Sequence, residues 1–112
     1  MNWKEIVSGI STKEGSSRLR LVVRGRVQGV GFRPSIYRFA EKAGVTGYVR
    51  NTGAGVVIEI EGEAAAIEAF ARMLSSDLPP LARIDSIDAE DLPGAGYERF
   101  VIEESEDAGS RD

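Results

Sequence analysis

The chain has 112 residues and a formal net charge of −4, and its length suits one domain with a single hydrophobic core. It contains no cysteine, which excludes disulfide bonds, thiolate nucleophiles and cysteine-bound zinc. It contains no histidine either, which excludes histidine nucleophiles, Ser-His-Asp triads and histidine-bound metals. We therefore expect no metal and no cofactor, and any catalysis must rely on other side chains and on the backbone.

The charge is divided unevenly along the chain. Residues 1–50 carry ten Lys and Arg against three acidic residues, whereas residues 51–112 carry four against fifteen. The acidic total argues against a nucleic-acid partner, although the basic first half can still direct a small anion into one cleft. No segment reaches the length of a membrane span and nothing resembles a signal peptide, so we expect a cytoplasmic protein without a membrane partner.

The first elements follow from the spacing of apolar residues. Residues 1–17 are polar, with glycines and paired serines, which predicts a flexible N-terminal arm. Residues 18–24 alternate between apolar and polar side chains, as in a half-buried strand. A glycine-containing loop follows. A helix is then expected to open at Pro34 and to end at Gly44, because the apolar residues between them have helical spacing.

The remaining elements complete a domain over residues 18–104. Two short strands, 47–51 and 56–61, flank a turn with the composition of a hairpin. A helix over residues 64–74 ends before a pair of prolines, and two further strands are expected at 84–91 and 100–102. This βαββαβ order predicts a ferredoxin-like α+β sandwich, an antiparallel sheet with two helices on one face. Residues 105–112 are expected to form a polar C-terminal tail.

The loop between the first strand and the first helix has the composition of an anion site. Gly25, Gly29 and Gly31 allow a tight backbone path that turns N–H groups inward and forms a nest for an anion. The helix N-terminus adds a partial positive charge at the same place. Arg33 lies at this N-terminus, where the helix dipole disfavours a cation unless an anion joins them. The segment therefore predicts a site for a phosphate or a carboxylate.

Two motifs carry a family resemblance. The first is Val27-Gln28-Gly29-Val30-Gly31-Phe32-Arg33. The second is Gly47-Tyr48-Val49-Arg50-Asn51, followed by a turn with glycines at 53 and 55. Both motifs occur in the order and in the elements that are typical of an acylphosphatase, so the chain resembles this family over roughly residues 18–104.

This resemblance implies hydrolysis of the carboxyl–phosphate bond of acyl phosphates, on a ferredoxin-like fold and without a metal. It implies that Arg33 binds the phosphoryl group and that Asn51 holds the attacking water. It also implies a phosphate-binding loop whose backbone N–H groups come from Gln28, Gly29, Val30, Gly31 and Phe32. The expected ligands are a small-molecule acyl phosphate and inorganic phosphate.

A narrower resemblance concerns one subgroup of the family. Pro34 directly after Arg33, residues 78–85 and residues 100–105 are similar to the acylphosphatase-like domain at the N-terminus of the hydrogenase maturation carbamoyltransferases. This similarity implies carbamoyl phosphate as a substrate and the further domains of a larger maturation protein as partners. The chain is then either a domain excised from such a protein or a free-standing relative, and both alternatives stay open.

Two functions of other classes are compatible with the same pattern. A βαββαβ domain can bind RNA, but RNA-binding sheets present aromatic residues on their central strands. The outward positions expected here are instead Arg18, Arg20, Val22, Val57, Glu59 and Glu61. A regulatory domain could bind an acyl phosphate or another anion without hydrolysing it. The presence of both Arg33 and Asn51 favours catalysis over binding alone.

Overall fold

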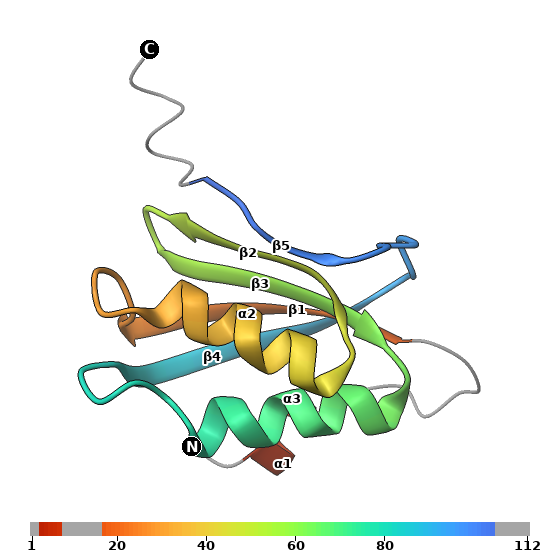
Figure 1. Cartoon of the computed structure of the whole chain (residues 1–112), viewed down its shortest axis with the longest axis horizontal. Coiled ribbons are helices and arrows are strands. Elements are labelled where there is room, and N and C mark those ends of the chain that lie inside the picture. The colour runs from red at the N-terminus through yellow and green to blue at the C-terminus, as the bar shows by residue number, and fades with distance from the viewer. Residues whose placement is uncertain (1–2, 8–16, 105–112) are drawn as a thin grey trace.

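The computed structural model describes residues 3–7 and 17–104, and all structural statements concern these residues. Figure 1 shows one sheet with the helices packed on one of its faces. The elements in chain order are α1 (Trp3–Val7), β1 (Ser17–Arg26), α2 (Phe32–Ala43), β2 (Thr46–Thr52), β3 (Gly55–Gly62), α3 (Ala64–Ser76), β4 (Arg83–Leu92) and β5 (Phe100–Ile102). The predicted ferredoxin-like α+β fold is confirmed.

The sheet is mixed, whereas the sequence predicted an antiparallel one. Its five strands have the order β4-β1-β3-β2-β5, and the pairs β1–β4, β1–β3 and β2–β3 are antiparallel. The pair β2–β5 is parallel. The reason is that residues 93–99 reverse the chain after β4 and carry it across the sheet to the opposite edge. Since β2 already runs opposite to β4, the reversed β5 is parallel to it.

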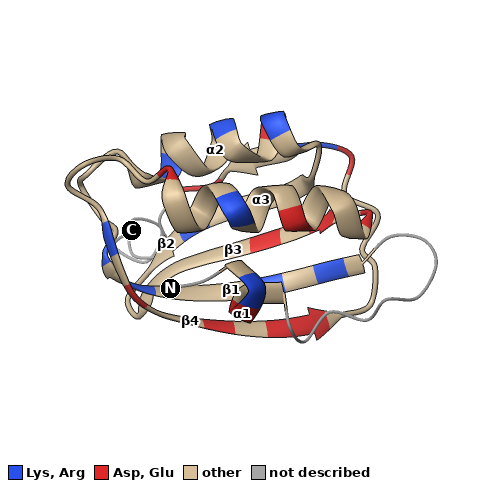
Figure 2. Cartoon of the chain, turned by 90° about the horizontal axis from the view of Figure 1, so that it is seen from below, with Lys and Arg blue, Asp and Glu red and all other residues tan. Residues whose placement is uncertain are grey.

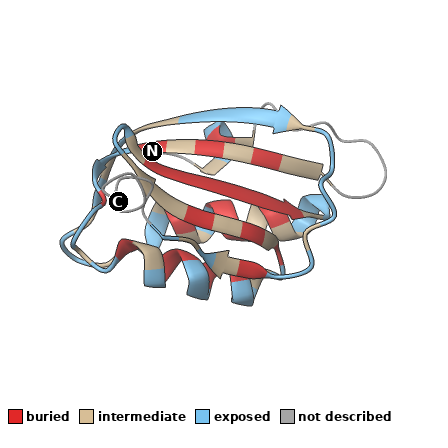
Figure 3. Ribbon diagram, turned by 90° about the horizontal axis from the view of Figure 1, so that it is seen from above, coloured by how far each residue is buried: buried red, intermediate tan, exposed pale blue. Residues whose placement is uncertain are grey.

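The hydrophobic core fills the space between the sheet and the helices. Alternate residues of β1 and β3 face this space and are almost completely buried: Leu19, Leu21, Val23, Val56, Ile58 and Ile60. The rings of Phe39 in α2 and Phe70 in α3 meet edge to face, with their centroids 6.5 Å apart. Figure 3 shows the alternation along β1, whereas β3 is buried along almost its whole length. The central strand is therefore covered on both faces.

Glu61 holds the segment that covers the second face of β3. The sequence placed Glu61 at an outward position, but only 9% of its surface is exposed, because residues 93–99 cross over it. Its carboxylate accepts hydrogen bonds from the backbone N–H groups of Ala95, Gly96 and Tyr97, at 3.1, 3.0 and 3.0 Å. The carboxylate thus fixes three consecutive residues of the crossing segment against the central strand.

Glu59 ties the same segment to three strands. It too is buried, with 4% of its surface exposed. Its carboxylate accepts hydrogen bonds from the hydroxyls of Tyr97 at 2.6 Å and Tyr48 at 3.1 Å, and from the guanidinium of Arg18 at 2.6 Å. Burial raises the pKa of Tyr48 to about 12, so this hydroxyl remains a donor at neutral pH. Glu59 therefore joins β1, β2 and β3 to the crossing segment.

The N-terminal region differs from its prediction in the part that the structure describes. Trp3–Val7 form the helix α1, where the sequence predicted a flexible arm over residues 1–17. Ile6 is 3% exposed and belongs to the core, and the Trp3 ring lies 4.2 Å from the guanidinium carbon of Arg72 in α3. A helix of five residues has too little periodicity to be found by pattern and depends on such packing. The expected arm at residues 8–16 and the expected tail at 105–112 lie outside the described residues.

The helix α2 begins at Phe32, two residues before the predicted start at Pro34. Phe32 is 1% exposed and anchors the first turn in the core. Pro34 fits at the third helical position, because the first N–H groups of a helix have no intrahelical partner. Gly44 ends the helix as predicted, with φ of 83° and its N–H donating to the carbonyl of Ala40 at 2.8 Å. Within the described ranges, no helix is long and apolar enough to cross a membrane.

We expect Gly47→Ala to lower the free energy of unfolding by about 3 kcal/mol. Gly47 has φ of +138°, and an added Cβ would lie 1.9 Å from the carbonyl oxygen of Glu59. Gly44→Ala is the matched control, since Gly44 also has a positive φ but an added Cβ would meet no described atom within 4 Å. Its cost should be about 1 kcal/mol. Urea denaturation of both variants tests this, and equal losses would contradict the steric explanation.

We also expect acid to weaken the fold through Glu59. Burial alone would raise the pKa of Glu59, but hydrogen bonds from Tyr97, Arg18 and Tyr48 hold it below 4.5, the ordinary value. A lowered pKa stabilises the folded state above pH 4.5, and this contribution is lost as the pH falls through the folded-state pKa. Unfolding free energies of Glu59→Gln and of the control Glu98→Gln, at an exposed position, measured across this range, should show a shallower acid decline only for Glu59→Gln.

Candidate anion-binding site

The loop that joins β1 to α2 is fixed at both ends and depends on two glycines. Val27 and Phe32 are 2% and 1% exposed, so each end is anchored in the core. Gly29 and Gly31 have φ of 73° and 77°, in the left-handed region that other residues rarely adopt. A Cβ at either position would meet no described atom within 4 Å. The backbone conformation, and not lack of space, therefore requires glycine at both positions.

This loop presents backbone donors that have no acceptor among the described residues. In the part of the chain that the structure describes, no N–H group from Gln28 to Phe32 donates to a backbone oxygen. Gly31 is the N-cap of α2, has no side chain to cap the helix, and precedes a first turn without acidic residues. The loop amides and the positive end of the helix dipole thus occur together.

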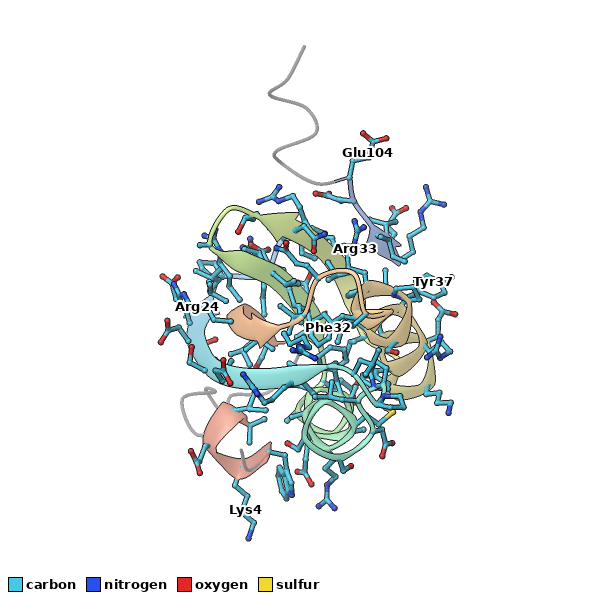
Figure 4. The ribbon with its side chains drawn as sticks, turned by 90° about the vertical axis from the view of Figure 1, so that its left-hand side faces the viewer. Lys4, Arg24, Phe32, Arg33, Tyr37 and Glu104 are labelled. Atoms are coloured by element: carbon cyan, nitrogen blue, oxygen red, sulfur yellow. The ribbon has the colours of Figure 1, made fainter. Side chains whose placement is uncertain are left out.

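Arg33 is the second residue of α2 and is half-buried. Its Nη1 donates to the backbone carbonyl of Glu103 at 3.2 Å. Among the described residues, no carboxylate forms a salt bridge with Arg33. The guanidinium therefore keeps most of its donors available for an anion at the helix N-terminus. Figure 4 shows Arg33 beside the loop that leads into α2, while Phe32 points into the core.

Asn51 lies near the end of β2, between two hydrogen bonds that tie this strand to the surroundings of Arg33 and to the loop. On one side, Glu103, whose carbonyl contacts Arg33, donates its N–H to the carbonyl of Val49 at 2.9 Å. On the other side, the side-chain amide of Gln28 donates to the carbonyl of Thr52 at 3.3 Å. The structure thus brings the loop, Arg33 and the end of β2 together. The Oδ1 atom of Asn51 is buried and has no hydrogen-bond partner among the described residues.

Two features of the site were missed from the sequence. Gln28 was expected to contribute its backbone N–H, but its side chain also ties the loop to the β2–β3 hairpin, with a second hydrogen bond to the carbonyl of Gly55 at 3.1 Å. Glu103 was assigned to no site, yet it contacts both Arg33 and Arg50. A role for the Gln28 side chain could have been predicted, because Gln28 belongs to the loop motif. Glu103 belongs to no motif, so the sequence around it gives no sign of its role.

The arrangement can bind an anion and orient a small polar molecule beside it. The backbone amides and the guanidinium supply donors without a group that titrates near neutral pH. A buried oxygen without a partner is costly unless it accepts a hydrogen bond, so Oδ1 of Asn51 suits a water or a ligand donor. No group of three or more metal-ligating side chains occurs among the described residues.

A separate hollow of about 670 Å³ lies at the other end of α2. Its lining includes Gly44, Glu61, Glu63 and Tyr97 but no residue of the loop, and neither Arg33 nor Asn51. Figure 2 shows the acidic residues gathered along β3 and β4, with basic residues on β1, α2 and α3. The acidic side chains in this hollow disfavour an anion. The loop, and not this hollow, is therefore the candidate anion-binding site.

Comparisons with known proteins identify the family of the chain. The family model for acylphosphatase matches residues 19–102. The chain is 57% identical over 88 residues to carbamoyltransferase HypF of Rhizobium leguminosarum bv. viciae, a match covering 79% of the chain but 11% of that protein. It is 40% identical over 92 residues to an acylphosphatase of Rubrobacter xylanophilus, covering 81% of the chain and 83% of that protein.

A solved structure supports the same assignment. Full-length HypF, in a phosphate- and nucleotide-bound form, aligns with a TM-score of 0.77 and 33% identity. The alignment covers 86% of this chain and 13% of HypF, so the chain spans about a tenth of the length of these larger relatives. The match over most of both chains to the Rubrobacter protein, and the family model that spans the domain, show that this chain belongs to the acylphosphatase family.

Proposed function

We propose that the chain hydrolyses acyl phosphates to a carboxylate and inorganic phosphate at the end of β2 and the start of α2. Family membership supports this class of reaction. One observation carries the assignment to this site: the buried Oδ1 of Asn51 has no partner among the described residues, and the next residue, Thr52, accepts a hydrogen bond from Gln28 of the loop. An acceptor for water thus lies on a segment that is tied directly to the loop whose amides can bind a phosphoryl group.

In this proposal each group has a defined role. The guanidinium of Arg33 and the amides of Gln28, Gly29, Val30, Gly31 and Phe32 bind the phosphoryl oxygens. They neutralise the charge that spreads over these oxygens in a loose transition state. Oδ1 of Asn51 accepts a hydrogen bond from the attacking water and orients it toward phosphorus. The carboxylate is a good leaving group, so positioning and charge stabilisation suffice without a strong base.

The finer proposal concerns the acyl group and the biological setting. The identity to HypF of Rhizobium leguminosarum bv. viciae is 57%, against 40% and 46% to the acylphosphatases of Rubrobacter xylanophilus and Anaeromyxobacter dehalogenans. We therefore propose that the chain acts on carbamoyl phosphate, as the N-terminal domain of a hydrogenase maturation carbamoyltransferase. Its partners are then the further domains of that protein, and its location is the cytoplasm. Comparing kcat/KM for carbamoyl phosphate and benzoyl phosphate tests the choice of acyl group.

Inorganic phosphate should stabilise the folded chain, because it is a product that fits the same donors. At about 100 times the dissociation constant, a single site stabilises by about 2.7 kcal/mol, which is measurable as a rise in the unfolding temperature. Arg33→Ala should remove most of this rise. The control is Arg99→Ala, because Arg99 is exposed and its backbone carbonyl contacts Gly47, at the opposite end of β2 from Asn51. An equal rise in both variants would place phosphate binding elsewhere.

Arg33→Ala should reduce kcat for benzoyl phosphate by about a thousandfold, and Asn51→Ala by about a hundredfold. Both variants should keep the circular dichroism spectrum of the parent chain, because neither side chain belongs to the hydrophobic core. An active Arg33→Ala variant would exclude this site. Phosphate binding by the parent chain with no turnover of any acyl phosphate would instead favour a regulatory, anion-binding domain.

A further inference from the structure

We propose that Arg50 and Glu103 form a positioning pair that holds Arg33 in place for the phosphoryl group. This inference rests on the proposed function and adds two residues to the site. Glu103 connects the two arginines. Its backbone carbonyl accepts a hydrogen bond from Nη1 of Arg33 at 3.2 Å, and its side chain accepts one from Nη1 of Arg50 at 3.4 Å. What holds Glu103 therefore also holds the guanidinium of Arg33.

The backbone alone holds Glu103 weakly. It directly follows β5, which has three residues and lies at the edge of the sheet beside β2. The N–H of Glu103 donates to the carbonyl of Val49 at 2.9 Å, as the last backbone bond to β2 that the structure describes. The end of a short edge strand opens easily, because few bonds must break. A side-chain contact at this position therefore has a direct effect on how often the carbonyl of Glu103 faces Arg33.

Arg50 is suited to hold Glu103 because it is itself fixed. Its guanidinium carbon lies 5.2 Å from the centre of the Tyr48 ring, and the Tyr48 hydroxyl donates to Glu59 at 3.1 Å. Its Nε is buried and has no hydrogen-bond partner within the described part of the chain. A buried donor without a partner costs free energy, so this side chain is not placed where its own hydrogen bonding would be best. Its contact with Glu103 explains why the side chain is placed there.

Simple electrostatics predicts the opposite effect for Glu103. A carboxylate beside an anion site repels phosphate, so its removal should strengthen binding. A positioning role predicts weaker binding, because Arg33 loses its fixed orientation. The sign of the effect of Glu103→Met on phosphate affinity therefore separates the two explanations. Glu104→Met is the matched control: Glu104 is exposed, carries the same charge one residue further along, and projects away from Arg33 (Figure 4).

The experiment uses the full chain and compares Arg50→Met, Glu103→Met, the double variant and Glu104→Met. It measures the dissociation constant for inorganic phosphate and the values of kcat and KM for benzoyl phosphate. We expect each single variant to raise the dissociation constant and KM about tenfold, with a smaller change in kcat. The double variant should be no weaker than either single variant, since the two side chains act as one unit. Glu104→Met should change both constants by less than about twofold.

Tighter or unchanged phosphate binding by Glu103→Met would overturn the inference, and so would additive losses in the double variant. Additive losses would mean that Arg50 acts on the anion directly. The proposed function fails separately, if the parent chain hydrolyses no acyl phosphate. The phosphate dissociation constants then still decide whether Arg50 and Glu103 position Arg33, because they do not depend on turnover. A parent chain that neither binds phosphate nor hydrolyses an acyl phosphate would overturn both.

Discussion

Two carboxylates on the central strand, Glu59 and Glu61, determine how the rest of the molecule is arranged. By accepting hydrogen bonds from Tyr97 and from three consecutive backbone amides, they hold residues 93–99 across the sheet. This crossing carries the chain from the β4 edge to the β2 edge, so β5 pairs with β2. It thereby delivers Glu103 to Arg33. Acidic residues far from the loop thus decide what surrounds the guanidinium of the site.

The candidate site depends mainly on backbone geometry, because the chain offers few side chains suited to catalysis. With neither histidine nor cysteine in the chain, the two side chains that titrate closest to neutral pH are absent from the site. The donors are instead amides, and their direction is set by Gly29 and Gly31 in left-handed conformations. Donors held by the backbone need no reorganisation when charge develops on a ligand. How well such a site binds its ligand then depends on how firmly its few side chains are oriented, Arg33 above all.

The sequence predicted the parts of the structure that have a local pattern. The order of strands and helices followed from alternation and helical spacing, and Gly44 marked a helix end because a left-handed cap favours glycine. Arg33 and Asn51 stood in recognisable motifs, and their catalytic roles remain predictions. Long-range contacts had no such signal. Arg33 and Glu103 are 70 residues apart, and the burial of Glu59 depends on a segment 34 or more residues away. Alternation showed which way Glu59 faces but not what would cover it.

The short helix α1 changes what counts as the folding unit. The residues that match the family model begin at 19, so α1 lies outside them. Yet Ile6 helps to enclose a hollow of about 170 Å³ between α3 and β4, together with Leu74, Leu78, Ile84 and Ile87. A chain trimmed to the family boundary would leave this apolar groove open to water, with a tendency to self-associate. The hydrophobic core therefore extends beyond the residues that the family model matches.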